Sequence, residues 1–415
     1  MSSSDGDTPG NMGGVSFERE DHVKYFLSCL KGLRSAYTSL DTTRLTVAYF
    51  SVIGLDMLDS LDQVDSKRVC NYIYGLQIAV NAEGGNALCR ECTRPHVSGN
   101  GGFLGSSCAG QEFRTYYDRG NATGNGSGNG KVDSANVLNF SQKGDAACSS
   151  SNGGERPGDC GCVSFEYMQG HLAMAYTSLA TLITLKDDLS RLDRPALLQS
   201  LQSAQLASGA FRATRTGNEA DMRFVFCACA ISYMLGDWSG VDRDRVVGYV
   251  KSCITYEGGV SLTPGTEAQG GATFCAVSSL VMMDKLEDIS VKARRALVGW
   301  CEQRVQTAGG YNGRTNKVPD SCYSFWIGAT LDMLGCFNNT DTLPALEFLL
   351  NECQYSHYMD RAGIGGFSKT PGDYPDILHT FYSIAWLSIN RSVSTLRPIF
   401  PTLAICQDKA DSIRS

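Results

Sequence analysis

The sequence predicts an all-α protein, an α/α barrel (toroid) of about six helical hairpins with an inner and an outer ring of helices. A pattern with a period of about 50 residues recurs between residues 170 and 390, as in repeated helical hairpins. Apolar segments of helix length alternate with amphipathic ones, and the period-2 alternation of β-strands is scarce. Helices that are apolar on every side are buried and amphipathic helices lie outside, so the two classes predict two concentric rings.

Each repeat has the same parts in the same order. A glycine turn is followed by an acidic residue, then an apolar helix, then an amphipathic helix that leads to the next turn. The turns contain Gly209, Gly258, Gly309 and Gly365, and the acidic residues are Asp221, Glu267, Asp320 and Asp376. The apolar helices are expected over 222–235, 270–283, 321–334 and 377–389, with earlier members at 43–58 and 171–185, and amphipathic helices over segments such as 242–255 and 291–307.

The acidic residue before each apolar helix predicts an N-cap. If each acid caps its helix, all inner helices begin at the same end of the barrel. Polar and reactive side chains such as Arg223, Gln269, Cys322 and His379 then gather at that end. Helix N-termini favour anions and thiolates, so the sequence predicts the functional site there.

Asp320, Cys322 and His379 offer a carboxylate, a thiolate and an imidazole. Such a set can hold one zinc ion and leave a fourth position open. Arg314 and Lys317 precede it, and two cations beside a metal can bind a diphosphate. The residues alone leave an alternative open, in which Cys322 is a core residue, Asp320 a helix cap and the basic loop a solvated surface.

The expected domain organisation is simple. Residues 1–19, rich in Ser, Gly and Asp, predict a disordered N-terminal tail, and 20–407 a single domain. A Gly/Ser/Asn-rich stretch at about 93–162 predicts a flexible surface insertion, and 408–415 a C-terminal tail. The pairs Cys89/Cys92 and Cys160/Cys162 lie in or beside this insertion and lack a tidy second pair for a four-ligand zinc site.

Composition excludes several classes of partner. The net charge of −7 argues against nucleic acid and against an anionic membrane surface. No run of about 18 apolar residues occurs, so no membrane span is expected. The start of the chain lacks the apolar run of a secretory signal. The 17 cysteines are odd in number and many lie in apolar helical patterns, which predicts reduced thiols and a cytoplasmic protein.

Several segments resemble the β subunits of protein prenyltransferases, and most closely those of the type I geranylgeranyl-transferring branch. The segments are 44–50 (RLTVAYF), 54–62 (GLDMLDSLD), 221–225 (DMRFV) and 322–326 (CYSFW). The resemblance runs from about residue 20 to 390, interrupted by the insertion. It implies an α/α barrel and a separate α subunit that supplies a catalytic lysine.

The resemblance also implies roles for particular residues. Asp320, Cys322 and His379 match the zinc ligands, and the substrate cysteine thiolate is the family's fourth ligand. Arg314, Lys317 and Tyr323 match the diphosphate-binding residues, so the catalytic set is Asp320, Cys322, His379, Tyr323 and Lys317. Gln269 stands where the family usually has histidine; it can donate a hydrogen bond to phosphate but carries no positive charge.

Two positions bear on the prenyl group. Thr46 stands where the farnesyl-transferring relative has a bulky tryptophan, which leaves room for about five more carbons. Lys369 stands where that relative has a magnesium-binding aspartate, so a lysine can supply the charge and magnesium is not expected to be required. Phe50, Phe325, Trp326 and Tyr382 are expected to line the lipid tunnel unless they are core residues. The peptide pocket is expected to comprise Thr46, His171, Ala173 and Phe224, with Arg223 near the peptide.

The leading expectation is therefore the β subunit of a protein geranylgeranyltransferase type I. Such an enzyme transfers geranylgeranyl from its diphosphate to the cysteine of proteins ending Cys-a-a-Leu, such as small GTPases. Farnesyl transfer and geranylgeranylation of Rab proteins are alternatives on the same fold. A non-catalytic α/α-toroid binding module is a third, which a metal triad beside an anion clamp disfavours.

Overall fold

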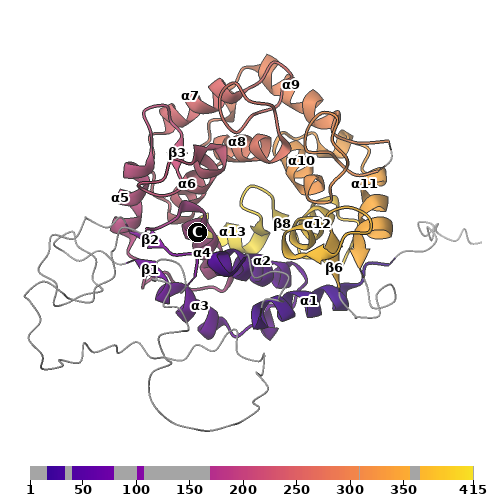
Figure 1. The fold of residues 1–415 in the computed structure, drawn as a ribbon, viewed down its shortest axis with the longest axis horizontal. Coiled ribbons are helices and arrows are strands. Elements are labelled where there is room, and N and C mark those ends of the chain that lie inside the picture. The colour runs from indigo at the N-terminus through magenta and orange to yellow at the C-terminus, as the bar shows by residue number, and fades with distance from the viewer. Residues whose placement is uncertain are drawn as a thin grey trace, which may run out of the picture.

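The computed structural model describes residues 16–32, 40–78, 101–106, 169–307, 309–355 and 365–414. Six apolar helices form an inner ring in which each packs against the next and α12 packs against α2, so the ring is closed (Figure 1). These helices are α2 (Arg44–Met57), α4 (Leu172–Thr184), α6 (Met222–Leu235), α8 (Gly270–Met282), α10 (Cys322–Met333) and α12 (Ile377–Asn390). The predicted fold class is confirmed, and the inner-helix boundaries agree within one residue.

An outer ring surrounds these helices (Figure 1). It comprises α1 (Arg19–Lys31), α3 (Ser66–Gly75), α5 (Arg194–Ala204), α7 (Arg243–Cys253), α9 (Val291–Glu302) and α11 (Leu343–Glu347), the last continued by the π-helix η7 (Phe348–Cys353). The outer helices bury only one face; α9 buries Leu297, Trp300 and Cys301 and exposes Val291. Short 3-10 turns precede three of them, at η2 (Leu61–Gln63), η5 (Leu286–Asp288) and η6 (Phe337–Asn339).

In the described residues, short antiparallel hairpins or isolated bridges lie between several outer helices and the next inner helix. They include β3 (Phe211–Arg212) with β4 (Ala220–Asp221), and β5 (Gln354–Tyr355) with β6 (Gly366–Ser368) and β7 (Pro375–Asp376). The glycine turns before them are sterically required: Gly258 has φ +102°, and a Cβ there would lie 2.6 Å from the carbonyl oxygen of Ala296. The glycine repeat therefore marks where the chain passes close beneath the next outer helix.

The predicted acidic N-caps are found at two inner helices. Asp221 and Asp376 cap α6 and α12 with their side chains. The prediction is wrong for Glu267, because Gln269 occupies the N-cap of α8 and its amide oxygen accepts from the backbone. At α10 the N-cap is Ser321, and Asp320 precedes it while accepting from the backbone N–H of Cys322. All these groups still lie at one end of the ring, which we call the mouth.

The C-terminal residues are not a tail. The expected boundary at 408 is wrong, because residues from Gln407 form helix α13 (Gln407–Arg414), in which Lys409 and Ala410 are buried. The guanidinium of Arg397 bridges the buried Asp56 of α2 and Asp408 of α13. Ion pairs between residues far apart in the sequence thus hold this helix in place. Local composition does not reveal such contacts.

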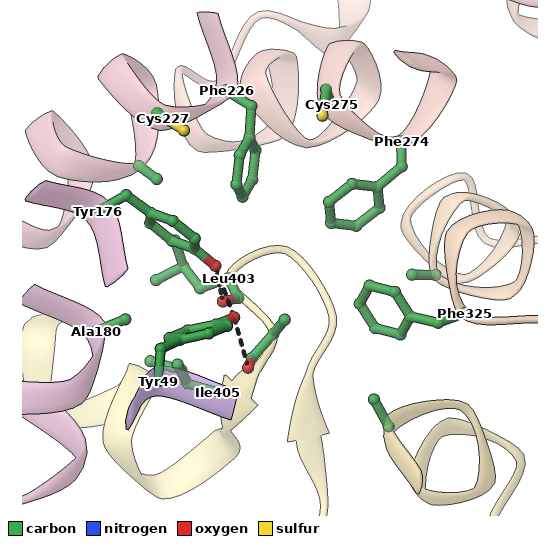
Figure 2. Close-up of a cluster of buried hydrophobic side chains, with 14 of the residues drawn as sticks. Tyr49, Tyr176, Ala180, Phe226, Cys227, Phe274, Cys275, Phe325, Leu403 and Ile405 are labelled. Atoms are coloured by element: carbon green, nitrogen blue, oxygen red, sulfur yellow. Dashed lines mark hydrogen bonds between the residues drawn. The ribbon is translucent and has the colours of Figure 1, made fainter. Parts of the chain in front are cut away.

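The hairpin before α13 closes the end of the ring opposite the mouth. Its strands are β8 (Ile399–Phe400) and β9 (Ile405–Cys406), and its tip, 401–404, enters the ring (Figures 1 and 2). Hydroxyls of Ser278, Tyr176 and Tyr49, from three inner helices, donate to the carbonyls of residues 402, 403 and 404 over 2.7, 2.9 and 3.5 Å. The tip is therefore held by the inner ring itself.

Two other expected boundaries need correction. Residues 101–106, inside the expected surface insertion, are partly core, since Phe103 is buried in β2 (Gly102–Phe103), which pairs with β1 (Gln77–Ile78). Helix α1 begins at Arg19 and Phe17 packs against His22, so ordered structure starts before the expected tail ends. The rest of the insertion, both cysteine pairs, and residues 1–15 lie outside the described residues.

Within the described ranges, no helix combines the length and apolar character needed to cross a membrane.

Candidate active site

Asp320, Cys322 and His379 converge at the mouth. One ligand atom from each lies within 4.8 Å of the others, and His379 Nε2 lies 3.2 Å from Asp320 Oδ1. Two neighbouring inner helices supply them: Cys322 begins α10 and His379 lies in the first turn of α12. The structure therefore brings together three side chains that are widely separated in sequence.

The loop before α10 is tied to β6, which pairs with β7, the strand that leads into α12. The backbone N–H of Ser321 donates to the carbonyl of Lys369 (2.9 Å), and its hydroxyl donates to the carbonyl of Ser368 (2.7 Å). Ser321 is fully buried. These bonds fix the start of α10 relative to β6, and hence Cys322 relative to His379.

Asp376 orients the imidazole of His379. Its Oδ2 lies 2.5 Å from Nδ1 of His379, while Nε2 faces Asp320. Burial acts to lower the pKa of His379, but its hydrogen bonds to Asp320 and Asp376 outweigh burial and raise the pKa to about 9. Burial likewise opposes ionisation of Asp320, yet the hydrogen bond and charge of His379 hold its pKa below the usual value. Burial raises the pKa of the Cys322 thiol.

This donor set fits a zinc ion. Carboxylate oxygen, thiolate sulfur and imidazole nitrogen are all zinc ligands, and three protein ligands leave a position for substrate. A carboxylate on the second ring nitrogen of a ligating histidine is a common supporting contact, and Asp376 provides it. Because ligands bind metals deprotonated, metal binding here would release the protons of Cys322 and His379.

A second group of possible ligands lies at the opposite end of the ring. Asp56, Cys406 and Asp408 also have donor atoms within 4.8 Å of one another. Arg397 contacts both carboxylates, and Lys409 contacts Asp408. These two cations already balance the two carboxylates, so the group serves as the ion-pair network that holds α13.

The predicted diphosphate residues lie around the same mouth. Arg314, 45% exposed, donates to Glu267 over 2.9 Å. Gln269 donates from Nε2 to the hydroxyl of Tyr323 over 3.0 Å. Lys317 and Lys369 are exposed, and the carbonyl of Lys369 receives the bond from Ser321 already described. Exposed cations beside the buried triad are accessible to an anion from solvent.

The predicted peptide-pocket residues gather on α2, α4 and α6. His171 caps α4 by accepting from the backbone N–H of Ala173, and its ring lies 5.7 Å from that of Phe224. The Arg223 guanidinium pairs with Asp221 and Glu219 and lies 5.3 Å from the Phe224 ring centroid. Thr46, half-buried, contacts the Met174 sulfur at 3.8 Å. These residues form one side of the mouth, with α10 and α12 on another.

A belt of aromatic rings lines the inside of the inner ring below the mouth. Every inner helix contributes at least one, and neighbouring centroids are 4.2–5.7 Å apart. Four members were predicted, namely Phe50, Phe325, Trp326 and Tyr382. Tyr49, Tyr176, Phe226, Phe274 and Phe381 were not. Figure 2 shows Phe226, Phe274 and Phe325 pointing toward the centre, facing the hairpin tip.

A sequence signal for the missed rings exists. Tyr176, Phe226, Phe274 and Phe381 each stand about one helical turn after the start of an inner helix. An aromatic residue that recurs at the same place in each repeat marks one level of the ring. The role of Asp376 as the partner of His379 had a local signal, because the N-cap carboxylate stands three residues before the histidine. The role of Glu267 as the partner of Arg314 had none, since that contact joins residues 47 positions apart.

Comparison with known proteins gives a family. Residues 17–405 match the prenyltransferase alpha-alpha toroid domain. The chain is 32% identical to the geranylgeranyl transferase type-1 subunit beta of Arabidopsis thaliana over 403 residues, 94% of this chain and 89% of the relative. It is 29% identical to the corresponding subunit of Dictyostelium discoideum over 96% of this chain and 97% of the relative. The protein farnesyltransferase subunit beta of Schizosaccharomyces pombe is 26% identical over 90% and 78%.

A solved structure shares the fold. The Candida albicans protein geranylgeranyltransferase-I, complexed with GGPP, matches with a TM-score of 0.70 and 21% sequence identity, covering 96% of this chain and 98% of that one. The family match spans nearly the whole ring, from the first outer helix to the closing hairpin. The chain therefore belongs to the prenyltransferase α/α toroid family.

Proposed function

We propose that this chain is the β subunit of a zinc-dependent protein geranylgeranyltransferase type I. The observation that carries the proposal is the convergence of Asp320, Cys322 and His379 at a mouth that also holds Arg314 and Tyr323, with Lys317 exposed three residues before Asp320. Two relatives that match nearly end to end bear the name of this subunit, which supports the same assignment.

The reaction joins the sulfur of a substrate cysteine to the first carbon of a geranylgeranyl group and breaks the bond from that carbon to the diphosphate. Zinc, when bound, lowers the pKa of a coordinated thiol so that a thiolate is available at neutral pH. Asp320, Cys322 and His379 would hold the ion, and Asp376 keeps Nε2 of His379 directed at it. Burial of Cys322 excludes water from this side of the site.

The leaving diphosphate gains negative charge as the bond breaks. Arg314 offers a forked donor, Lys317 a point charge and the Tyr323 hydroxyl a hydrogen bond. Donors already in place where charge develops lower the barrier more than donors that must reorganise. Gln269 keeps the Tyr323 hydroxyl in position over 3.0 Å.

The aromatic belt supports a prenyl group as the lipid. Its aromatic rings are buried, except Trp326, which is partly buried, and the belt begins one helical turn below Cys322 and His379. Thr46 lies one helical turn above Tyr49 and Phe50, so its small side chain favours the longer geranylgeranyl chain over farnesyl. The exposed Lys369 supports charge stabilisation without magnesium.

The proposed enzyme works as a heterodimer with a prenyltransferase α subunit and acts on proteins ending Cys-a-a-Leu. The test is co-expression of the two subunits, followed by transfer of labelled prenyl groups to peptides ending in Leu or Met. Geranylgeranyl diphosphate should outcompete farnesyl diphosphate at equal concentration in a single turnover. If farnesyl diphosphate wins, the lipid assignment is wrong; if neither is transferred, the enzyme assignment is wrong.

A further inference from the structure

A buried arginine lies behind the loop that carries Arg314 and Lys317. Arg304, only 5% exposed, follows the end of α9. Its guanidinium lies 4.8 Å from the Trp300 ring centroid, and its Nε donates to the carbonyl of Trp300 over 3.3 Å. Its Nη1 donates to the hydroxyl of Thr315, the residue after Arg314, over 3.2 Å. The buried cation therefore contacts the proposed diphosphate loop directly.

The backbone of Arg304 holds the same loop. The N–H of Asn312 donates to the carbonyl of Arg304 over 3.0 Å. The side-chain amide of Asn312 in turn donates to the carbonyl of Lys317 over 3.1 Å. The loop 312–317 is thus supported at its start, its middle and its end by contacts that begin at Arg304.

The charge of Arg304 is unusual for its burial. A buried guanidinium is costly unless it is hydrogen-bonded and near counter-charges. Its hydrogen-bond acceptors in the described part of the chain are neutral, and its counter-charges are the carboxylates of Glu257 and Glu267. Both glutamates line one groove of about 380 Å³ on the outside of the ring. Oε2 of Glu257 is buried and has no hydrogen-bond partner among the described residues.

Glu267 pairs with Arg314 and contributes to the electrostatic surroundings of Arg304. It accepts from Arg314 over 2.9 Å, and its charge acts to raise the pKa of Arg304, though less than that of Glu257. A diphosphate that binds Arg314 must draw this guanidinium away from Glu267. The free carboxylate would then repel the incoming anion unless another cation balances it. Arg304 is the buried cation available to do so.

We propose that Arg304 is a positioning residue for the prenyl diphosphate, holding the 312–317 loop through Thr315 and retaining Glu267 as its counter-ion when Arg314 turns to the diphosphate. This inference rests on the proposed function, because it assumes that Arg314 binds the diphosphate head.

The test uses the complex of this chain with its α subunit. Dissociation constants for geranylgeranyl diphosphate are measured by calorimetry, with inorganic pyrophosphate as a probe of the head group alone, and KM and kcat by peptide prenylation. Arg304→Gln should weaken binding of both probes about 10-fold or more, the value of a charge-assisted hydrogen bond, and change kcat at saturation less than about twofold. Arg304→Lys should recover most of the loss.

A double-mutant comparison separates this role from a merely structural one. Glu267→Gln alone should tighten binding, because Arg314 is then released. In the Glu267→Gln background, Arg304→Gln should cost less than in the wild type, since Glu267 no longer needs a counter-ion and only the Thr315 contact and the charge of Glu257 still involve Arg304. Arg295→Gln removes an exposed arginine from the same outer helix, α9, and should leave binding unchanged.

Three results would overturn the inference. One is unchanged diphosphate binding in Arg304→Gln. Another is an equal loss with and without Glu267→Gln. The third concerns Thr315→Val, which removes only the hydroxyl that Arg304 contacts and serves if Arg304→Gln does not assemble. Unchanged diphosphate binding in Thr315→Val would also overturn the inference. Failure of the proposed function would look different: the wild-type complex would transfer no prenyl group to a cysteine peptide.

Discussion

Nδ1 of His379 lies 2.5 Å from Oδ2 of Asp376, while the opposite ring nitrogen lies 3.2 Å from Asp320 Oδ1. Asp376 also caps helix α12 by accepting from the backbone N–H of His379. One carboxylate therefore sets both the start of the helix and the direction of the imidazole. The proposed zinc site therefore depends on a residue that was expected only to cap a helix.

Asp376→Asn should weaken zinc binding. The asparagine can still cap α12, but it no longer places a negative charge against Nδ1, and loss of such a partner costs about 10- to 100-fold in metal affinity. The measurement is competition for zinc against a chelator in the purified complex. Asp373→Asn, an exposed neighbour in the preceding turn, is the matched control. Equal zinc affinity in the two variants would show that Asp376 does not support the site.

Gln269→His should make diphosphate binding depend on pH. Gln269 carries no charge, whereas a histidine with a pKa near 6.5 would add a charge-assisted hydrogen bond when protonated. Binding should tighten roughly 5- to 10-fold between pH 8 and pH 6, relative to wild type. Calorimetric titration with geranylgeranyl diphosphate measures this. Gln269→Asn should show no such change, and identical pH profiles for Gln269→His and wild type would contradict the placement of Gln269 at the diphosphate.

Thr46→Trp should shift the preferred prenyl group from 20 to 15 carbons. An indole beside Met174 would fill the space above Tyr49 and Phe50, and a few extra carbons change selectivity in an apolar pocket by about 10-fold or more. The ratio of kcat/KM for the two prenyl diphosphates is the readout. Thr46→Ser retains a small side chain and should retain the wild-type ratio. A tryptophan variant that still prefers the longer chain would show that Thr46 does not limit the tunnel.

His22 should make folding stability fall in mild acid. It is fully buried, and burial lowers its pKa from 6.5 to about 4. Its Nδ1 accepts from the Gly366 N–H, so Nε2 donates to Gln354. The unfolded chain binds a proton that the folded chain excludes, so the free energy of unfolding should drop as pH falls from 6.5 to 4, by on the order of 3 kcal/mol. The free energy of unfolding in urea is measured against pH for the wild type and for His22→Gln, and it should depend less on pH in the variant. The same pH dependence in both proteins would contradict this.

Local sequence rules were sufficient for most of the ring. The apolar helices were predicted within one residue because nearly every face of each is buried. Each therefore appears in the sequence as a continuous apolar segment, and the ends of that segment mark the ends of the helix. The C-terminal helix was missed because it has the composition of a surface segment, with Asp408 and Lys409 near its start. Its order comes from Arg397 and Asp56, a contact between distant parts of the chain.

The candidate site also has a part that the sequence could predict and a part that it could not. Asp320, Cys322 and His379 stood out through a family resemblance, and the structure gives their proximity. Glu267 illustrates the limit of the repeat argument. At its equivalent position the other repeats place a cap or a ligand, but Gln269 takes the cap of α8 and leaves Glu267 to pair with Arg314. Such a change of partner follows from packing between repeats and has no signature in a single repeat.

Zinc analysis of the wild-type and Cys322→Ala complexes tests the central claim most directly, because Cys322 has a donor atom within 4.8 Å of both other ligands. The account predicts about one zinc per wild-type heterodimer with geranylgeranyl transfer to a Leu-ending peptide, and loss of both metal and transfer in Cys322→Ala. Cys336→Ala, a free cysteine beyond the other end of α10, should keep both. A Cys322→Ala complex that holds zinc and transfers the prenyl group at the wild-type rate would contradict it.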